Sequence, residues 1–190
     1  MLYHPEHSRW NERAPDTARV RFETTKGAFV IESVRARAPI GADRFYNLVR
    51  SGFFDDSRFF RVLPGYIAQF GVSGDPAVTA IWNDRALPDD RPGLSNVRGT
   101  VAYAMRGPND RRTQIYINVA DNTKNDAEGF AVFGRVVRGM VVVDRLNSEY
   151  GEDSGGGMRR GRQQRLLGEG NGWLDREFPR LDRLIRASVQ

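Results

Sequence analysis

Apolar and polar residues alternate over residues 19–34, which is the period of a β-strand with one buried face. The stretch Thr25-Lys26-Gly27 interrupts the alternation, and a short stretch ending in glycine is typical of a tight turn. These residues therefore predict a β-hairpin. Its buried positions would be Val20, Phe22, Thr24, Phe29 and Ile31.

The period changes to that of an α-helix over residues 39–51, with Pro39 near the start and Gly52 just past the end. A second, shorter helix is predicted over residues 139–147. We expect these two helices to cap a sheet. The apolar face of the first helix would carry Gly41, Phe45, Leu48 and Val49.

Short strand-like runs make up most of the remaining regular pattern, and many short strands favour a closed antiparallel barrel, which leaves no exposed sheet edges. One or two helical turns are expected at residues 172–178. The predicted strand regions are residues 53–71, 99–105, 113–119, 129–137 and 182–189.

Polar stretches rich in proline or glycine divide the chain. Residues 73–96 contain three prolines and predict a long loop, and residues 150–180 predict a second, extended loop. Residues 1–18 are mostly polar and predict an irregular arm. We therefore expect one domain over residues 19–190, preceded by this arm.

The residue inventory excludes several kinds of chemistry. The chain of 190 residues has no cysteine, which removes disulfides, thiolate nucleophiles and thiolate metal sites. Its two histidines, His4 and His7, stand near the N-terminus and could together bind a metal only weakly, so we expect neither a Ser-His-Asp triad nor a histidine zinc site in the core. No carboxylate pair stands out. We expect no metal and no cofactor.

The charge balance is basic but scattered. The net charge is +5 and the pI about 9.9, and the bases are interleaved with acids, as in Asp84-Arg85, without a basic stripe that carries aromatic residues. We expect no nucleic-acid binding; a basic nucleic-acid binder, whose affinity would fall steeply with salt, is kept as an alternative. The longest aliphatic run, residues 140–143, is too short to span a membrane.

Residues 59–69 carry the clearest candidate chemistry, with the sequence Phe-Phe-Arg-Val-Leu-Pro-Gly-Tyr-Ile-Ala-Gln. If the Pro-Gly pair is only a bend, one face of an extended chain carries Arg61, Leu63, Ile67 and Gln69. This face offers a cationic donor and an amide to a bound backbone, but no nucleophile and no acid–base pair. Its chemistry would proceed without proton transfer; the alternative is an ordinary solvated edge strand.

Two further segments complete a family pattern. Residues 101–117 contain Ala-Met-Arg-Gly-Pro-Asn and Thr-Gln-Ile-Tyr-Ile, and residues 126–136 contain Phe-Ala-Val-Phe-Gly-Arg-Val. With residues 59–69 they match, in order, F-x-R-x-x-P-G-[FY]-x-x-Q, A-x-x-G-P-N, [ST]-Q-[FIVL]-[FY]-I and [FH]-x-x-F-G-x-V. The chain thereby resembles the cyclophilins, including bacterial members, which are peptidyl-prolyl cis–trans isomerases. The resemblance covers about residues 19–146 and the last strand.

The resemblance implies a mainly β fold: a closed eight-stranded antiparallel barrel capped by two α-helices. It also implies isomerisation of X–Pro bonds in peptides and folding proteins, against a barrier of about 18–20 kcal/mol that arises from amide resonance. By similarity, Arg61 would donate a hydrogen bond toward the prolyl nitrogen as the bond twists. Gln69, which matches an amide that holds this arginine, is the second candidate catalytic residue.

The candidate substrate-binding residues come from the same pattern. Gln114 matches an amide that holds the substrate backbone, and Ala104 and Met105 match a strand whose backbone pairs with the peptide. The residues that match the walls of the proline pocket are Tyr66, Ile67, Tyr116 and Phe130.

The chain departs from the family pattern at the pocket. Asn125 stands where a leucine usually lines the pocket, and Arg106 replaces a small residue beside the Gly-Pro-Asn turn. Residues 123–128 lack the tryptophan of the cyclosporin-sensitive members, which predicts weak cyclosporin binding. These departures keep a second hypothesis open: a proline-peptide binding module of the same fold with little or no turnover.

The implied partners are proline-containing peptides and unfolded or partly folded proteins. We expect a monomer without a membrane span. The sequence does not decide the compartment: it is compatible with a cytoplasmic location, or with a periplasmic or secreted one if a signal segment has been removed.

Overall fold

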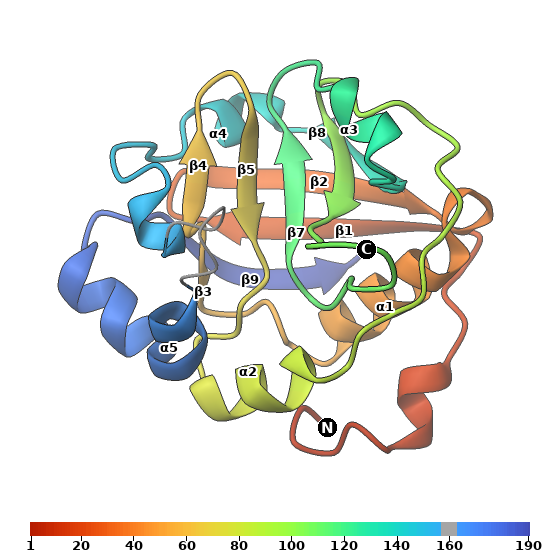
Figure 1. The fold of residues 1–190 in the computed structure, drawn as a ribbon, viewed down its shortest axis with the longest axis horizontal. Helices are drawn as coiled ribbons and strands as arrows, with labels where there is room; N and C mark the ends of the chain where they lie inside the picture. Colours follow the sequence, from red (N-terminus) through yellow and green to blue (C-terminus); the bar gives the residue numbers. More distant parts are fainter. Residues whose placement is uncertain (157–162) are drawn as a thin grey trace.

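Antiparallel pairing of short strands dominates the structure. The computed structural model describes residues 1–156 and 163–190, and its strands form one curled sheet (Figure 1). The order of the strands in the sheet is β3-β9-β1-β2-β8-β6-β7-β5-β4. Their bounds are β1 Thr17–Thr24, β2 Gly27–Val34, β3 Ser57–Arg58, β4 Arg61–Leu63, β5 Ile67–Phe70, β6 Thr100–Tyr103, β7 Ile115–Asn118, β8 Val132–Arg138 and β9 Arg183–Val189.

The two ends of the sheet meet at Phe59 and Phe60. These two residues separate β3 from β4 along the chain, although the two strands stand at opposite ends of the sheet order. The sheet therefore curls back on itself, and β4, β5 and β7 cross in front of β1, β2 and β9 (Figure 1). The predicted mainly β, antiparallel fold is confirmed, but β3 and β4 are not paired among the described residues, so the sheet is curled rather than closed by hydrogen bonds. The described residues form nine strands rather than eight, because Phe59 and Phe60 interrupt residues 57–63.

The β1–β2 hairpin builds the centre of the core. Its register runs from Thr17 opposite Val34 to Thr24 opposite Gly27, as the alternating pattern predicts. Phe22 and Phe29 lie opposite each other, and their ring centroids stack 5.1 Å apart. Burial of a phenylalanine side chain contributes about 1.5–3 kcal/mol, so a core rich in this residue stabilises the curled sheet. Other phenylalanines of this core cluster with no exposed surface are Phe45, Phe54, Phe59, Phe70 and Phe133.

Two of the helices confirm the predicted caps. α1 (Pro39–Arg50) begins with a proline in its first turn and buries its apolar face against the sheet. α4 (Met140–Asp144) is shorter than predicted; it follows Gly139, whose φ of 82° is accessible to glycine at little cost. In Figure 1 the two helices lie at opposite ends of the curled sheet. α3 (Lys124–Ala127) is a single turn.

The loop predicted over residues 73–96 is wrong in part, because it contains α2 (Pro76–Asn83). The Asp75 carboxylate accepts a hydrogen bond from the Ala77 backbone N–H at 2.8 Å, and Pro76 occupies the first turn. An N-cap aspartate followed by proline is a helix start signal. The prolines further along the segment, Pro88 and Pro92, disfavour a helix only beyond the end of α2.

The loop predicted over residues 150–180 is also wrong in part. It contains the 3-10 helix η3 (Asp153–Gly155) and α5 (Gln164–Glu177), which is kinked at Gly170; residues 157–162 lie outside the described residues. α5 packs against α2. Apolar side chains of α5 and of neighbouring segments form a second hydrophobic cluster. Its buried members are Phe60, Val72, Leu166, Trp173, Leu174 and Leu181.

The N-terminal arm folds back onto the domain. It contains the 3-10 helix η1 (Ser8–Asn11). The Trp10 and Trp82 rings lie 4.3 Å apart, and Trp82 donates a hydrogen bond to the Leu2 carbonyl at 3.0 Å. No helix within residues 1–156 and 163–190 combines the length and the apolar character that a membrane span needs.

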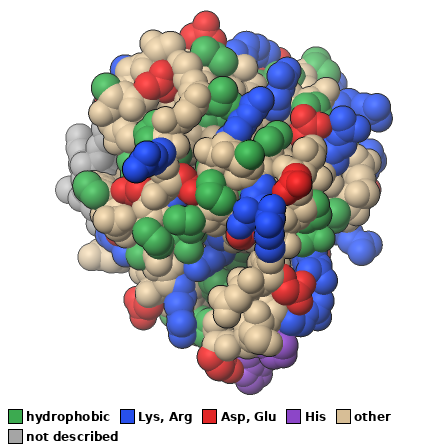
Figure 2. Space-filling model, turned by 90° about the vertical axis from the view of Figure 1, so that its right-hand side faces the viewer, with side chains coloured by type: hydrophobic (Ala, Val, Ile, Leu, Met, Phe, Trp, Pro, Cys, Tyr) green, Lys and Arg blue, Asp and Glu red, His purple; other side chains and the backbone are tan. Residues whose placement is uncertain are grey.

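Basic side chains on the surface alternate with acidic ones. On the face shown in Figure 2, lysine and arginine are mixed with acidic and uncharged side chains, and histidine lies at one edge. Many of these charges are paired: Arg19 contacts Glu32 at 2.9 Å, and Arg98 contacts Asp144 at 2.7 Å. Exposed pairs of this kind each contribute about 0–1 kcal/mol.

Candidate active site

The β4–β5 hairpin places the two candidate catalytic residues side by side. Arg61 lies directly opposite Gln69, so the two side chains leave the sheet on the same face. The intervening Pro-Gly pair reverses the chain rather than bending it, and Gly65 adopts a φ of 69° at the turn. The shared face that the sequence predicted is present, and it comes from a hairpin instead of one extended strand.

Arg61 begins a chain of directional hydrogen bonds. Its Nη1 donates to Gln69 Oε1 at 3.0 Å, and Gln69 Nε2 donates to Gln114 Oε1 at 3.0 Å. Because a guanidinium can only donate, Gln69 must turn its oxygen toward Arg61 and its amide nitrogen toward Gln114. Arg61 and Gln69 are 6% and 1% exposed, so this orientation is fixed in a buried setting.

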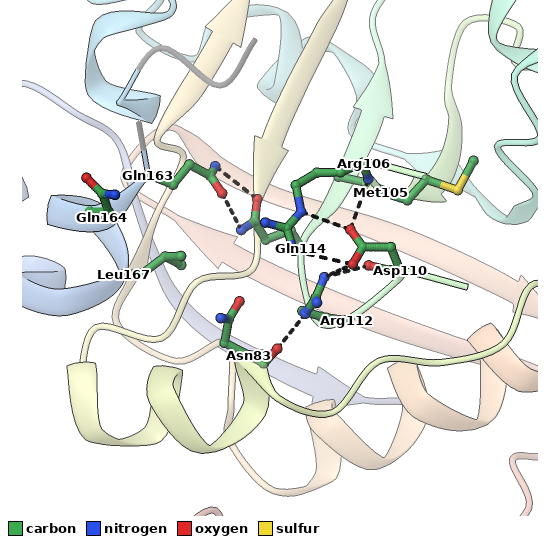
Figure 3. A pocket seen from close by; sticks show the side chains of 10 residues that line it. Asn83, Met105, Arg106, Asp110, Arg112, Gln114, Gln163, Gln164 and Leu167 are labelled. Atoms are coloured by element: carbon green, nitrogen blue, oxygen red, sulfur yellow. Dashed lines mark hydrogen bonds and ion pairs between the residues drawn. The ribbon is translucent and has the colours of Figure 1, made fainter. Parts of the chain in front are cut away.

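The chain of hydrogen bonds continues into the C-terminal segment. Gln114 Nε2 donates to Gln163 Oε1 at 3.1 Å, and Gln163 directly precedes α5 (Figure 3). The sequence reading did not include Gln163, since it lies 49 residues from Gln114 in a segment predicted to be a loop. The structure therefore adds Gln163 to the residues that surround the candidate site.

A carboxylate also contacts Arg61. Glu152 Oε1 lies 2.5 Å from Arg61 Nη2. The sequence reading missed this residue as well, because it lies 91 positions from Arg61 and outside the matched motifs. Arg61 Nε is buried and has no hydrogen-bond partner among residues 1–156 and 163–190. A buried donor without a partner is costly, which is typical of sites where a ligand completes the bonding.

An apolar cluster lies beside Arg61. Tyr116 and Phe130 meet edge to face at 5.8 Å between ring centroids, and the Arg61 guanidinium carbon lies 5.9 Å from the Tyr66 ring. The structure thus brings together all four residues predicted to form the walls of a proline pocket. The full cluster is Tyr66, Ile67, Ala102, Ala104, Tyr116 and Phe130.

Two buried asparagines contact the Tyr116 hydroxyl of this cluster. Burial raises the pKa of the Tyr116 hydroxyl, which stays protonated and donates to Asn96 Oδ1 at 3.0 Å. Asn125 Nδ2 reaches the same hydroxyl at 3.4 Å, while Asn125 Oδ1 is buried without a partner in the described part of the chain. Asn125, 2% exposed, therefore reaches this cluster only through the Tyr116 hydroxyl, and it is poorly satisfied there.

Figure 3 shows a second pocket, of about 250 Å³, which shares Ala104 with the apolar cluster. Ala104 belongs to both, whereas Met105 lines this second pocket. The Ala104 N–H donates to the Gln114 carbonyl at 2.9 Å, so this donor is already used. The other lining residues are Asn83, Arg106, Asp110, Arg112, Gln114, Gln163, Gln164 and Leu167.

Paired charges form one wall of the second pocket. Arg106 Nε donates to Asp110 Oδ2 at 3.0 Å, and Arg112 also contacts the Asp110 carboxylate. Partial burial opposes ionisation of Asp110, but hydrogen bonds from Arg106 and Arg112 outweigh it and lower the pKa of Asp110 to about 2. The Arg106 charge is therefore compensated within the wall. In the described residues no three histidine, aspartate or glutamate side chains group as a metal site would require.

Comparison with known proteins decides the family. The sequence model described as "Cyclophilin type peptidyl-prolyl cis-trans isomerase/CLD" matches residues 19–164. The chain is a member of the cyclophilin family. Its enzymatic activity is that of a peptidyl-prolyl cis–trans isomerase.

Bacterial cyclophilins are among its relatives. The chain is 33% identical over 147 residues to peptidyl-prolyl cis-trans isomerase A of Dickeya dadantii, a match that covers 75% of this chain and 77% of the relative. It is 35% identical over 147 residues to a peptidyl-prolyl cis-trans isomerase of Acinetobacter baylyi, covering 70% and 75%.

Solved structures show the same fold. The crystal structure of a Cryptosporidium parvum cyclophilin-type isomerase superposes with a TM-score of 0.67 at 18% identity and covers 92% of this chain and 98% of that one. A second structure of that protein, obtained in the presence of the dipeptide Ala-Pro, has a TM-score of 0.65 and covers 90% and 98%. The cyclophilin fold of this chain therefore extends over nearly its whole length.

Proposed function

We propose that Arg61 is the catalytic residue of this isomerase and acts through its charge. A prolyl bond keeps its geometry through amide resonance, and any donor that localises the lone pair on the prolyl nitrogen lowers the barrier to rotation. A guanidinium is permanently charged and offers fixed donors. The observation that carries the proposal is the buried Arg61 side chain beside the apolar cluster, held by Gln69 at 3.0 Å.

The neighbouring residues suit the rest of a prolyl peptide. Tyr66, Ile67, Tyr116 and Phe130 would hold the proline ring, and Gln114 would bind the peptide backbone together with the Met105 main chain. Gln69 would orient Arg61. The second pocket would receive a neighbouring residue of the same peptide, since Ala104 borders both spaces.

The test is a protease-coupled isomerase assay on a prolyl peptide. Loss of one preorganised donor to a developing charge typically lowers the rate about 10²–10³-fold, so we expect Arg61→Ala to lose at least about 100-fold in kcat/KM while still binding peptide. The matched control is Arg21→Ala, which removes an exposed arginine and should keep full activity. Arg58→Ala is unsuitable as a control, because Arg58 is buried and forms its own ion pairs. An active Arg61→Ala variant would overturn the assignment.

We propose that the natural substrates are proline-containing segments of unfolded or partly folded proteins, which a monomer would bind. A structure of the Cryptosporidium parvum relative in the presence of the dipeptide Ala-Pro supports the binding of proline-containing peptides by this fold. Refolding of a protein limited by prolyl isomerisation should accelerate with added cyclophilin and not with Arg61→Ala.

Light scattering during size exclusion should give the mass of one chain, 21.5 kDa.

A further inference from the structure

The segment after α4 contributes a side chain to the catalytic arginine. Glu152 Oε1 contacts Arg61 Nη2 at 2.5 Å, while Gln69 accepts from the other terminal nitrogen, Nη1, at 3.0 Å. The Arg61 side chain is 7% exposed and that of Glu152 is 36% exposed. Each terminal nitrogen of the guanidinium therefore has its own partner, and the two partners come from different parts of the fold.

Glu152 is held in place by the backbone around it. It directly precedes η3, whose Ser154 hydroxyl donates to the Phe60 carbonyl at 2.7 Å. Phe60 is the residue before Arg61, and Ser154 is 1% exposed. The Glu152 carbonyl accepts from the Gly155 N–H at 3.1 Å. The loop is thus fixed to the chain immediately beside Arg61, and this anchoring sets where the Glu152 carboxylate can reach.

Two anchors restrain a guanidinium in a way that one does not. A single hydrogen bond at Nη1 leaves the planar group free to swing about that contact, whereas partners at both terminal nitrogens define the orientation of its plane. Catalysis by a preorganised donor depends on placement within a fraction of an ångström, which requires support from residues around the catalytic group. Gln69 of β5 supplies that support at Nη1, and Glu152, from the segment after α4, supplies it at Nη2.

We propose that Glu152 is a positioning residue that sets the orientation of Arg61 for prolyl isomerisation. The proposal rests on the proposed role of Arg61 and extends it to a carboxylate outside the family motifs. Glu152 acts through the hydrogen bond that it accepts, so a neutral acceptor of the same shape should replace it. The alternative is an inhibitory role, in which the negative charge of Glu152 draws Arg61 away from the substrate. In that case removal of the Glu152 carboxylate would raise the rate.

The experiment measures kcat and KM separately for Glu152→Ala and Glu152→Gln. We expect Glu152→Ala to lower kcat about tenfold or more, with KM within about twofold, because the arginine is lost from its productive orientation while the apolar cluster still binds peptide. Glu152→Gln keeps an oxygen acceptor at the same position and should stay within about threefold of the wild type. Asp153→Ala, the exposed neighbouring carboxylate, is the matched control for the loss of one charge and should leave both constants unchanged.

A double-mutant cycle with Arg61 separates positioning from a general structural role. At enzyme concentrations that reveal residual catalysis, Glu152→Ala should have no further effect in the Arg61→Ala background. The proposal is overturned if Glu152→Ala is fully active or faster than the wild type, if Glu152→Gln is as slow as Glu152→Ala, or if the loss persists without Arg61. An active Arg61→Ala variant would instead remove the proposed role of Arg61, so the two failures are distinguishable.

Discussion

Asn125 is a buried, poorly satisfied polar residue next to the apolar cluster of this cyclophilin. Its Oδ1 is buried without a partner among the described residues, and its Nδ2 makes one long contact of 3.4 Å with Tyr116. Tyr116 keeps its better bond to Asn96 without this contact. A buried polar group in this state costs about 1–3 kcal/mol, so the position favours an apolar residue of similar size.

We therefore predict that Asn125→Leu stabilises the protein. The free energy of unfolding should rise by about 1 kcal/mol, which corresponds to an increase in Tm of about 2–4 °C for a domain of this size. Asn125→Ala is the matched control, because it removes the same amide but leaves a cavity, and it should lower stability. Urea unfolding of the three proteins measures both effects, and a less stable Asn125→Leu variant would contradict the prediction.

Cyclosporin sensitivity is a second property set by single residues. No tryptophan occurs in residues 123–128; instead Lys124 Nζ lies 5.0 Å from the Tyr66 ring. Trp82 and Trp173 are 2% and 5% exposed and belong to the core clusters. Without an indole that offers both apolar area and an N–H donor at the pocket rim, we expect weak inhibition. Titration of the isomerase activity with cyclosporin measures this, and stoichiometric inhibition would show the prediction to be wrong.

At this scale the sequence predicts what local motifs contain. Arg61 and Gln69 lie eight positions apart on one hairpin, and their pairing follows from a short stretch of chain. Glu152 and Gln163 reach the same site from distant positions, and no short-range pattern marks them. The packing of η3 and α5 brings these two side chains to the site. Hydrophobic alternation and turn signals in the sequence do not predict that packing.

At the scale of elements, strands were easier to predict than the helices outside the caps. The β1–β2 hairpin carries its register in its own alternation. α5 contains Gly168, Gly170 and Gly172, which disfavour a helix by about 1 kcal/mol each relative to alanine. It forms because Leu166, Trp173 and Leu174 are buried against Phe60 and Val72, and such tertiary burial outweighs local propensity. A long-range contact therefore decides an element that looks like a loop in sequence.

The kink in α5 provides a test of this packing. Gly170 has φ 54° and ψ −136°, and a Cβ built there would lie 2.5 Å from the Gly74 carbonyl oxygen. We expect Gly170→Ala to lower the free energy of unfolding by about 2 kcal/mol or more, because both the backbone conformation and the space exclude a side chain. Gly168 lies in the same helix, and a Cβ there meets no atom of the described residues within 4 Å. Gly168→Ala should be neutral or stabilising by about 0.5–1 kcal/mol. Equal effects of the two substitutions in chemical denaturation would contradict this account of the kink.

At the scale of the whole molecule, several hydrogen-bonded carboxylates have lowered pKa values and make the stability depend on pH. Hydrogen bonds from arginine lower the pKa of Asp56, and bonds from Ser95 and Asn96 lower that of Asp126, in each case against partial burial, which acts the other way. Asp110 belongs to this group, with a pKa of about 2. These carboxylates have lower pKa values when folded than the usual value of about 3.9. The unfolded chain therefore binds more protons than the folded one between about pH 4 and pH 2, and the protein should lose stability as the pH falls through that range.

Asp110→Asn tests one contributor to this acid sensitivity. Asparagine can still accept a hydrogen bond but cannot ionise, so the variant should be less stable than the wild type at pH 7 and should lose less stability between pH 4 and pH 2. The two stability curves should converge toward pH 2, because protonation removes the Asp110 charge from the wild type as the pH approaches its folded pKa. Asp84→Asn, at an exposed aspartate, controls for the change of one charge. Guanidinium chloride screens these ion pairs, so unfolding is followed in urea at fixed ionic strength. Parallel curves for wild type and Asp110→Asn across this range would show that the arginine contacts around the second pocket do not stabilise the ionised carboxylate.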